Sequence, residues 1–225
     1  MSFLSYAWSW LRSPAQWHGS GGIPIRILEQ LGYSGLSLLI AALIAVPLGV
    51  LIGHTGRGAL LVVNFANAWR AIPTLGLLVL AVITLGFSPL AWLIPLVVLG
   101  IPPIMVNAYE GVAGVDPEIM DAARGMGMTP WQQVRKVEVP VAVPLIMLGL
   151  RTGAIFVVAT ATIAAYIGLG GLGRYIIDGL AVNDYGEVAG GAALVALLAL
   201  AVQIVFVGLR RLVVPAGLRK QAQQP

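Results

Sequence analysis

The stretch Ala71–Tyr109, AIPTLGLLVLAVITLGFSPLAWLIPLVVLGIPPIMVNAY, holds 39 residues without a single Asp, Glu, Lys or Arg. A helix needs about 20 mostly apolar residues to cross the hydrocarbon core of a bilayer, so this stretch is too long for one span and about right for two. The sequence Gly-Phe-Ser-Pro at 86–89 divides it, because Gly and Pro beside Ser mark a turn. We therefore predict one span that ends near Leu85 and another from Leu90 to about Asn107.

Three further apolar runs flank this stretch. They give predicted spans at Leu36–Ile52, Val141–Ile167 and Val188–Leu209, of which only the second contains a charge, Arg151. The chain of 225 residues is 59% hydrophobic and 10% charged, against about 25% charged in a soluble domain. A soluble globular enzyme is therefore excluded, and we predict an all-α, polytopic integral membrane protein with five spans. The run Ala59–Trp69 is an interfacial helix, the start of a long second span, or a sixth element.

Three regions are predicted along the chain. Residues 1–30 form an N-terminal segment rich in Trp and Tyr, which favour the membrane interface, and its start lacks the basic residues of a signal peptide. Residues 31–212 form the transmembrane domain, and within it residues 110–138 are the one substantial polar segment. Residues 213–225 form a cytoplasmic tail.

The basic residues near the span ends indicate the orientation, since Lys and Arg are retained on the cytoplasmic side. Placing Glu110–Glu138 inside leaves only Arg12, Arg26 and Arg174 outside. With five spans, the N-terminus is then external and the C-terminus cytoplasmic. The basic residues placed inside are Arg57, Arg124, Arg135, Lys136, Arg210, Arg211, Arg219 and Lys220.

The polar segment opens with a helix-start signal. In Asp-Pro-Glu at 116–118, Asp suits the N-cap, Pro the first helical position and Glu the positive end of the helix dipole. A short helix is expected to follow and to end at Gly125 or Gly127, because glycine accepts a left-handed conformation. Thr-Pro at 129–130 repeats the signal and predicts a second helix that ends before Pro140.

The spacing in this segment resembles the EAA motif of ABC importer permeases, which reads E-A-A, three residues, G, nine residues, I-x-L-P. Here Asp-Ala-Ala at 121–123 is followed after three residues by Gly127 and after nine more by Val-x-Val-Pro at 137–140. The resemblance implies a type I importer permease core whose short helix docks on an ATP-binding subunit. An amphipathic loop helix on the membrane is the alternative. The ATPase-coupling residues predicted are Asp121, Ala122, Ala123, Gly127 and Pro140, with apolar contacts from Ile119, Met120 and Met126.

ATP must be hydrolysed by a partner, because the sequence has no G-x-x-x-x-G-K-[ST] phosphate loop. We therefore predict no catalytic residue and no cofactor in this chain, with ATP and Mg²⁺ in the partner subunit. Gly168–Gly173 satisfies G-x-G-x-x-G, but these glycines end a membrane span, whereas dinucleotide binding requires a preceding strand. A flexible helix-ending turn is predicted instead, with a role in contacting a binding protein or shaping the outer gate.

The resemblance extends over Leu36–Leu212, and its details favour the permeases of osmoprotectant importers. Those proteins carry glycine betaine, choline, carnitine or proline betaine, and the similar segments are GLRTG at 149–153, ATATIAAYIGLGGLG at 159–173, IDGL at 177–180 and NDY at 183–185. Methionine importers share the Arg-x-x-Pro at 70–73 and the Gly-Gly-Leu-Gly loop, and are the alternative.

The partners and location follow from the same resemblance. It implies a bacterial inner-membrane protein with a cytoplasmic ATP-binding subunit dimer, a second permease that is identical or homologous, an external substrate-binding protein and no nucleic acid. Substrate would cross by alternating access, driven by closure of the ATP-binding subunits.

Four polar residues are candidates for the translocation path. Arg151 lies 11 residues past Pro140, about 16 Å along a helix, so it should face a water-filled path or the bundle interior. It either attracts the carboxylate of a zwitterionic substrate or bonds carbonyls and asparagines of neighbouring spans, as polar residues in membrane bundles commonly do. The candidates are Arg70, Arg151, Asn67 and Asn107.

Other classes of protein and site lack support. A motor-independent carrier predicts acidic residues within spans, and the predicted spans contain none; an intramembrane enzyme would need a paired catalytic constellation. The chain has no Cys, and neither His18 nor His54 has an acidic or histidine neighbour at ligand spacing, so no metal site is predicted. An aromatic cage for a quaternary ammonium cannot be assigned from residues as scattered as Trp69, Trp92, Phe156 and Tyr166.

Overall fold

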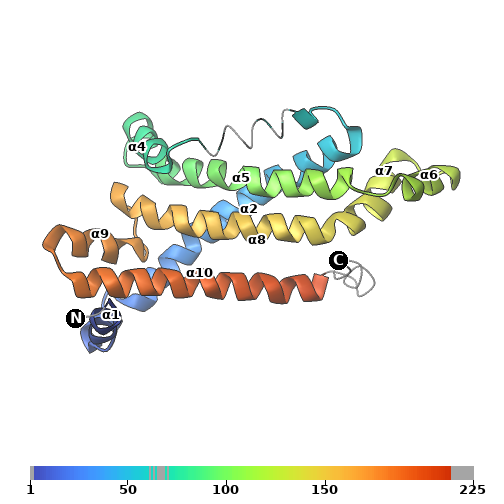
Figure 1. Cartoon of the computed structure of the whole chain (residues 1–225). Coiled ribbons are helices and arrows are strands. Elements are labelled where there is room, and N and C mark those ends of the chain that lie inside the picture. Colours follow the sequence, from blue (N-terminus) through green and yellow to red (C-terminus); the bar gives the residue numbers. More distant parts are fainter. Residues whose placement is uncertain (1–2, 61, 63, 65–68, 70, 214–225) are drawn as a thin grey trace. The chain divides into compact units, whose positions relative to one another are not determined.

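The computed structural model describes residues 3–60, 62, 64, 69 and 71–213, which form helices and no strand (Figure 1). The predicted all-α fold is confirmed for these residues. In chain order the elements are α1 (Phe3–Leu11), η1 (Pro14–Trp17), α2 (Ile23–Thr55), α4 (Thr74–Leu85), α5 (Pro89–Ala113), α6 (Pro117–Gly125), α7 (Pro130–Gln133), η2 (Val134–Glu138), α8 (Val139–Ala164), η3 (Ala165–Ile167), α9 (Gly173–Val182) and α10 (Tyr185–Val213).

Four helical runs are long and apolar enough to cross a membrane. They are α2, α5, α10 and the run Pro130–Ile167, which contains α8. Each covers a predicted span and extends beyond it. The remaining predicted span, which ends near Leu85, coincides with α4. The 12 residues of α4 rise about 18 Å, less than the ~30 Å of the hydrocarbon core. The prediction for Ala59–Trp69 falls largely outside the described residues.

Helix α2 begins at Ile23, well before the predicted Leu36. The early turns contain Arg26 and Glu29, whose side chains form an ion pair at 2.9 Å. Because two opposite charges three residues apart on a helix compensate each other, they do not end the apolar helix, and a search for charge-free runs places its start too late. Glu29 lies within α2 but before the predicted span Leu36–Ile52, so the absence of acidic residues from the spans themselves stays a prediction.

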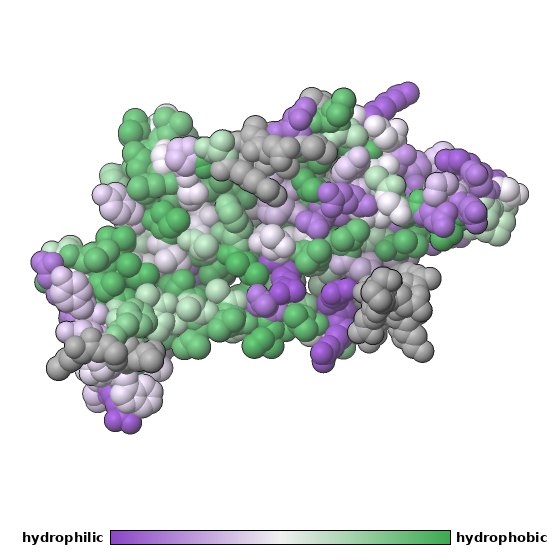
Figure 2. Space-filling view, in the orientation of Figure 1, coloured by the Kyte–Doolittle hydropathy of each residue, from purple (hydrophilic) through white to green (hydrophobic). Residues whose placement is uncertain are grey.

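The chain divides into two compact units. Unit 1 comprises Met1–Leu39, Ile72–Leu99 and Ala154–Val202, and unit 2 comprises Ile40–Ala71, Gly100–Gly153 and Gln203–Pro225. Each of α2, α5, α8 and α10 contributes one part of its length to each unit. Hydrophobic side chains lie along α10, whereas hydrophilic ones gather over α6, as expected for a membrane helix and a polar connection (Figure 2).

Unit 1 packs around aromatic and aliphatic side chains. The rings of Trp10 in α1 and Tyr175 in α9 meet edge to face, with centroids 4.9 Å apart. Trp10 also covers Gly190 in α10, where a Cβ atom would collide with the indole. In the N-terminal segment Trp10 is therefore buried, while Trp8 and Trp17 remain exposed. The interfacial role of that segment stays a prediction.

Unit 2 packs through small residues on its helices. A Cβ atom at Gly49 of α2 would lie 2.6 Å from the carbonyl oxygen of Met105 in α5, and one at Gly53 would lie 2.7 Å from the Val112 Cβ. A Cβ at Gly149 of α8 would lie 2.8 Å from the Asn107 Cβ. Small residues allow membrane helices to approach closely, which explains these glycines within long apolar helices.

Candidate functional site

The predicted coupling segment contains two short helices, each with a side-chain cap at its start. The Asp116 carboxylate accepts a hydrogen bond from the Glu118 N–H at 2.9 Å and caps α6, with Pro117 in the first turn. Gly127 has φ +74°, a left-handed conformation that lets the chain turn after α6. Both predicted signals are confirmed. Figure 1 shows α6 and α7 together beyond the ends of α5 and α8.

Helix α7 begins with a capping box. The Gln132 N–H donates to the Thr129 Oγ1 at 3.4 Å, and the Thr129 N–H donates to the Gln132 Oε1 at 2.9 Å. Two backbone donors at the start of the helix are satisfied in this way. The Thr-Pro signal therefore marks a helix start as predicted, and side-chain caps begin both α6 and α7.

The coupling residues separate into an exposed and a buried group. Ile119, Ala122 and Met126 are exposed, Ile119 by 46% and Met126 by 70%. Met120 and Ala123 lie on the side of α6 that is buried within this chain. They therefore hold α6 in place rather than offering contact to a partner. The other exposed members are Asp121, which pairs with Arg124 at 3.0 Å, and Gly127.

Trp131 was not among the predicted coupling residues. It follows Pro130 in the first turn of α7 and is 70% exposed. An exposed Trp within a polar segment is a signal that sequence reasoning could have used, because Trp is enriched among residues that anchor protein interfaces.

The second helix of the segment does not end before Pro140, so that prediction was wrong. The helix runs on from α7 through a π-helical turn, η2, into α8. Pro140 lacks an N–H, and its ring collides with a carbonyl in a regular α-helix. In the turn before it, the Val139 N–H donates to the Val134 carbonyl, five residues back. The wider turn accommodates the proline while the helix continues.

The last residue of this turn, Glu138, contacts the end of α2. The Nδ1 atom of His54, at the end of α2, lies 2.9 Å from both carboxylate oxygens of Glu138, which is only 4% exposed. The two residues are 84 positions apart, so no spacing in the sequence points to their contact. Among the described residues no group of three or more His, Cys, Asp and Glu side chains is placed to hold a metal ion.

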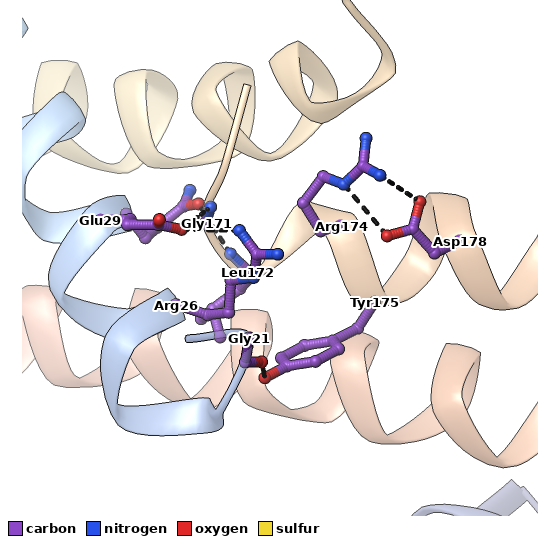
Figure 3. A network of polar contacts seen from close by, with 9 residues as sticks. Gly21, Arg26, Glu29, Gly171, Leu172, Arg174, Tyr175 and Asp178 are labelled. Atoms are coloured by element: carbon purple, nitrogen blue, oxygen red, sulfur yellow. Dashed lines mark hydrogen bonds and ion pairs between the residues drawn. The ribbon is translucent and has the colours of Figure 1, made fainter. Parts of the chain in front are cut away.

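The Gly168–Gly173 loop is pinned by the first turns of α2 (Figure 3). The Gly171 N–H donates to the Glu29 carboxylate at 2.8 Å, and the Leu172 N–H donates to the Gln30 Oε1 at 3.2 Å. The Gln30 amide in turn donates to the Val158 carbonyl at 3.0 Å. Gln30 is fully buried. The loop is therefore held in place, contrary to the flexible turn predicted from its glycines.

Glycine is required in this loop for two reasons. Gly168 and Gly171 have φ of +91° and +89°, the left-handed region that favours glycine. A Cβ at Gly170 would lie 2.5 Å from a Glu29 oxygen, and one at Gly173 would collide with the Thr162 carbonyl. The match to the dinucleotide motif therefore reflects turn geometry and close packing.

Helix α9 continues the same polar network. The Tyr175 hydroxyl donates to the Gly21 carbonyl at 2.6 Å, and Arg174 pairs with Asp178 at 2.7 Å (Figure 3). Burial raises the pKa of Tyr175 above its ordinary value of 10.0, and the Arg26 guanidinium opposes this with a smaller effect. The tyrosine is therefore a neutral hydrogen-bond donor at physiological pH.

Two of the four candidates for the translocation path, Arg151 and Asn107, lie among the described residues. Arg151 lies in α8 and is half-buried, and none of the described acidic side chains pairs with it. The Asn107 amide donates to the Pro103 carbonyl of its own helix at 2.7 Å and lies against Gly149. Arg70 and Asn67 fall outside the described residues.

One of the aromatic residues that are scattered in the sequence has an aromatic partner in the structure. Trp92 pairs with Tyr33, with ring centroids 4.9 Å apart. The two rings line a pocket of about 280 Å³ with Phe87 and the 167–170 stretch, and its lining residues carry no charged side chain. Phe156 and Tyr166 are exposed elsewhere in unit 1.

Long apolar helices with a capped helix pair inserted between two of them define this chain as a membrane transport permease. It belongs to the family of binding-protein-dependent transport system inner membrane components, whose match covers residues 45–217. The predicted family resemblance and permease fold are thereby confirmed. As a membrane component of a transport system, the chain is a permease rather than an enzyme.

Relatives and solved structures agree with this assignment. The chain is 37% identical to the glycine betaine/carnitine/choline transport system permease protein OpuCB of Bacillus subtilis (strain 168), over 85% of this chain and 88% of that protein. It is 34% identical to the choline transport system permease protein OpuBB of the same organism, over 89% and 92%. A solved structure of the MetNI methionine ABC transporter in an inward-facing conformation matches with a TM-score of 0.73 and 26% identity, over 84% of this chain and 94% of that chain.

Proposed function

We propose that this chain is the permease subunit of an ATP-driven importer for osmoprotectants with a quaternary ammonium group, such as glycine betaine, choline, carnitine or proline betaine. The observation that carries the proposal is a capped helix with exposed apolar side chains, in a chain 34–37% identical to permeases named for such substrates. A substrate-binding protein delivers the molecule from outside, and the permease passes it to the cytoplasm by alternating access.

The docking face on the ATP-binding subunit consists of Ile119, Ala122 and Met126, with Trp131 beside it on α7. The first three have the i, i+3, i+7 spacing of one helix face, and all are exposed. Ala122 at the centre leaves room for a close approach. Asp121 and Gly127 border this face, while Met120, Ala123 and Pro140 support it from within the chain.

The assembled transporter contains two ATP-binding subunits, which hold ATP and Mg²⁺, and a second permease that is identical or homologous. Residues 31–212 form the membrane domain, preceded by an interfacial segment at 1–30 and followed by a cytoplasmic tail at 213–225. The protein lies in the bacterial inner membrane with its N-terminus outside. The excess of Lys and Arg on the side of the 110–138 segment supports this orientation.

Because the sequence contains no Cys, single cysteines report the orientation without background. A membrane-impermeant maleimide applied to intact spheroplasts should label Ala181→Cys and not Met126→Cys. Both positions are exposed, and both should react after the membrane is permeabilised. Labelling of Met126→Cys in intact spheroplasts would overturn the orientation.

The docking face is tested by Ala122→Glu, with Ala181→Glu as the matched control at another exposed alanine in α9. Burying an unpaired carboxylate in the interface should lower glycine betaine uptake and recovery of the ATP-binding subunit with the purified permease by about 30-fold, equivalent to ~2 kcal/mol. The control should keep both near wild type. Unchanged copurification and uptake for Ala122→Glu would contradict docking at this face.

Methionine is the second candidate substrate, favoured by the likeness to the MetNI transporter structure. Uptake of labelled glycine betaine by vesicles containing the complete transporter discriminates between the two. Excess choline or carnitine should compete in an osmoprotectant importer, whereas uptake of labelled methionine without uptake of glycine betaine would favour the alternative.

A further inference from the structure

The contact between His54 and Glu138 ties the end of α2 to the stretch that joins the coupling segment to α8. His54 is the penultimate residue of α2, and Glu138 is the last residue of η2. The Glu138 carboxylate is almost fully buried, and both of its oxygens lie 2.9 Å from the His54 Nδ1. Within the described part of the chain, His54 is the one side chain that pairs with this carboxylate.

The π-helical turn sets the direction in which Glu138 points. An α-helix turns by about 100° per residue, so the extra residue of a π-turn changes the face presented by the residues that follow. The turn here contains the five residues directly before α8, with Pro140 just after it. A short π-helical insertion within a helix is often found at functional sites. The proline of the motif thus positions a carboxylate toward α2.

The chemistry of the pair favours a positioning role over a stabilising one. A buried carboxylate and the polar group that it contacts lose much of their hydration, and a well-packed apolar pair often stabilises a fold equally well or better. The best-attested use of a buried polar pair is to fix how two elements sit against each other. At this position the pair fixes the end of α2 relative to the helix that leaves the coupling segment.

We propose that His54 and Glu138 form the joint through which movement of the coupling segment reaches α2. The run from α7 into α8 is one continuous helix, so movement of the segment acts on α8 through the backbone. The ion pair adds α2 as a second element that follows the same movement. This inference rests on the proposed function, since it assumes that the 110–138 segment receives force from an ATP-binding subunit.

The test uses the complete transporter in proteoliposomes, with its binding protein and ATP-binding subunits, and measures glycine betaine uptake and ATP hydrolysis together. Glu138→Gln keeps the shape of the side chain and removes its charge, and His54→Gln replaces the imidazole ring with an uncharged amide on the other side of the contact. Each should lower the number of substrate molecules moved per ATP by at least about fivefold while the amount of assembled complex stays near wild type. The double variant should be no worse than either single variant, because both remove one contact.

Asp178→Asn is the matched control. It removes the charge from an acidic residue whose ion pair, Arg174–Asp178, is partly exposed and lies within the single helix α9, and it should leave the ratio of uptake to ATP hydrolysis unchanged. The double variant His54→Glu with Glu138→His should restore part of the lost uptake per ATP hydrolysed, because the same two side chains then meet in exchanged positions.

Two results would overturn the joint. If uptake, ATP hydrolysis and recovered complex fall together in the variants, the pair supports the fold and does not transmit movement. If the ratio of uptake to ATP hydrolysis is unchanged, the contact has no part in coupling. Failure of the docking proposal is seen separately, in unaltered copurification of Ala122→Glu with the ATP-binding subunit.

Discussion

The contacts inside unit 1 differ in kind from the contacts inside unit 2. In unit 1, the Gly168–Gly173 loop is fixed by directional hydrogen bonds from the Glu29 and Gln30 side chains to backbone N–H groups. In unit 2, glycines at 49, 53 and 149 let helices pack against each other with little side chain between them. Hydrogen bonds specify one geometry, whereas smooth packed helices can slide by small amounts. The difference indicates that unit 1 resists rearrangement. Unit 2 permits small shear movements around the contact between His54 and Glu138.

The largest effect is expected where unit 1 has no room to adjust. In Gly173→Ala, the new Cβ would collide with the Thr162 carbonyl, which is backbone and cannot turn aside. Overpacking typically costs 1–3 kcal/mol and sometimes more, so we expect a loss of about 3 kcal/mol in the free energy of unfolding. The loss would be measured as a lower thermal midpoint in detergent and a poor yield of monodisperse protein.

Gly35→Ala is the matched control in the same unit. A Cβ at Gly35 meets nothing within 4 Å, and alanine is favoured over glycine within a helix by roughly 0.5–1 kcal/mol. The control should be as stable as wild type or slightly more so. If Gly173→Ala were equally stable, the pinned geometry of the loop would be contradicted.

Local sequence patterns predicted the two helix starts in the 110–138 segment. Each of its caps depends on residues two or three positions apart, as with Asp116 and Glu118 or Thr129 and Gln132, and such neighbours are close whatever the rest of the chain does. Apolar runs likewise located the long helices, although the compensated charges of Arg26 and Glu29 concealed the true start of α2.

Contacts between distant residues could not be predicted in this way. The loop bonds of Glu29 and Gln30 join residues 142 positions apart, and the His54–Glu138 pair joins residues 84 apart. Their partners are chosen by how the helices pack, and a single sequence contains no local signal of that packing. The glycines at 168–173 can be read from the sequence. The polar side chains of α2 that contact this loop, and that require glycine there, cannot be read from it.

An intermediate effect is expected in unit 2 for Gly149→Ala. The new Cβ would lie 2.8 Å from the Asn107 Cβ and 3.1 Å from the Pro103 carbonyl, so α5 and α8 must separate slightly. We expect a loss of about 1–2 kcal/mol in stability and a larger fractional loss of uptake, because the helices can no longer slide at close distance. Thermal midpoint and uptake per assembled complex should be measured together.

Gly208→Ala provides the control for unit 2, since a Cβ there meets nothing within 4 Å. It should leave stability and uptake close to wild type. An uptake loss in Gly149→Ala that merely follows the loss of folded protein would show that close packing in unit 2 serves stability alone.

The smallest effect is expected from Tyr175→Phe in unit 1, and its pH dependence makes it specific. The variant loses the hydrogen bond from the hydroxyl to the Gly21 carbonyl at 2.6 Å, a loss of about 1 kcal/mol at neutral pH. Burial raises the pKa of Tyr175 above 10.0 in the folded protein, so an unfolded chain releases this proton at lower pH than the folded one does. The contribution of Tyr175 is therefore fully present below pH 10 and declines as the pH rises through the raised pKa. Measured as the difference in thermal midpoint between the wild type and Tyr175→Phe, the advantage of the wild type should be constant from pH 6 to 9 and shrink above about pH 10. A difference that stays constant to higher pH would mean that the tyrosine titrates at its ordinary value in both states, and that the contact with Gly21 contributes less to the rigidity of unit 1 than its geometry indicates.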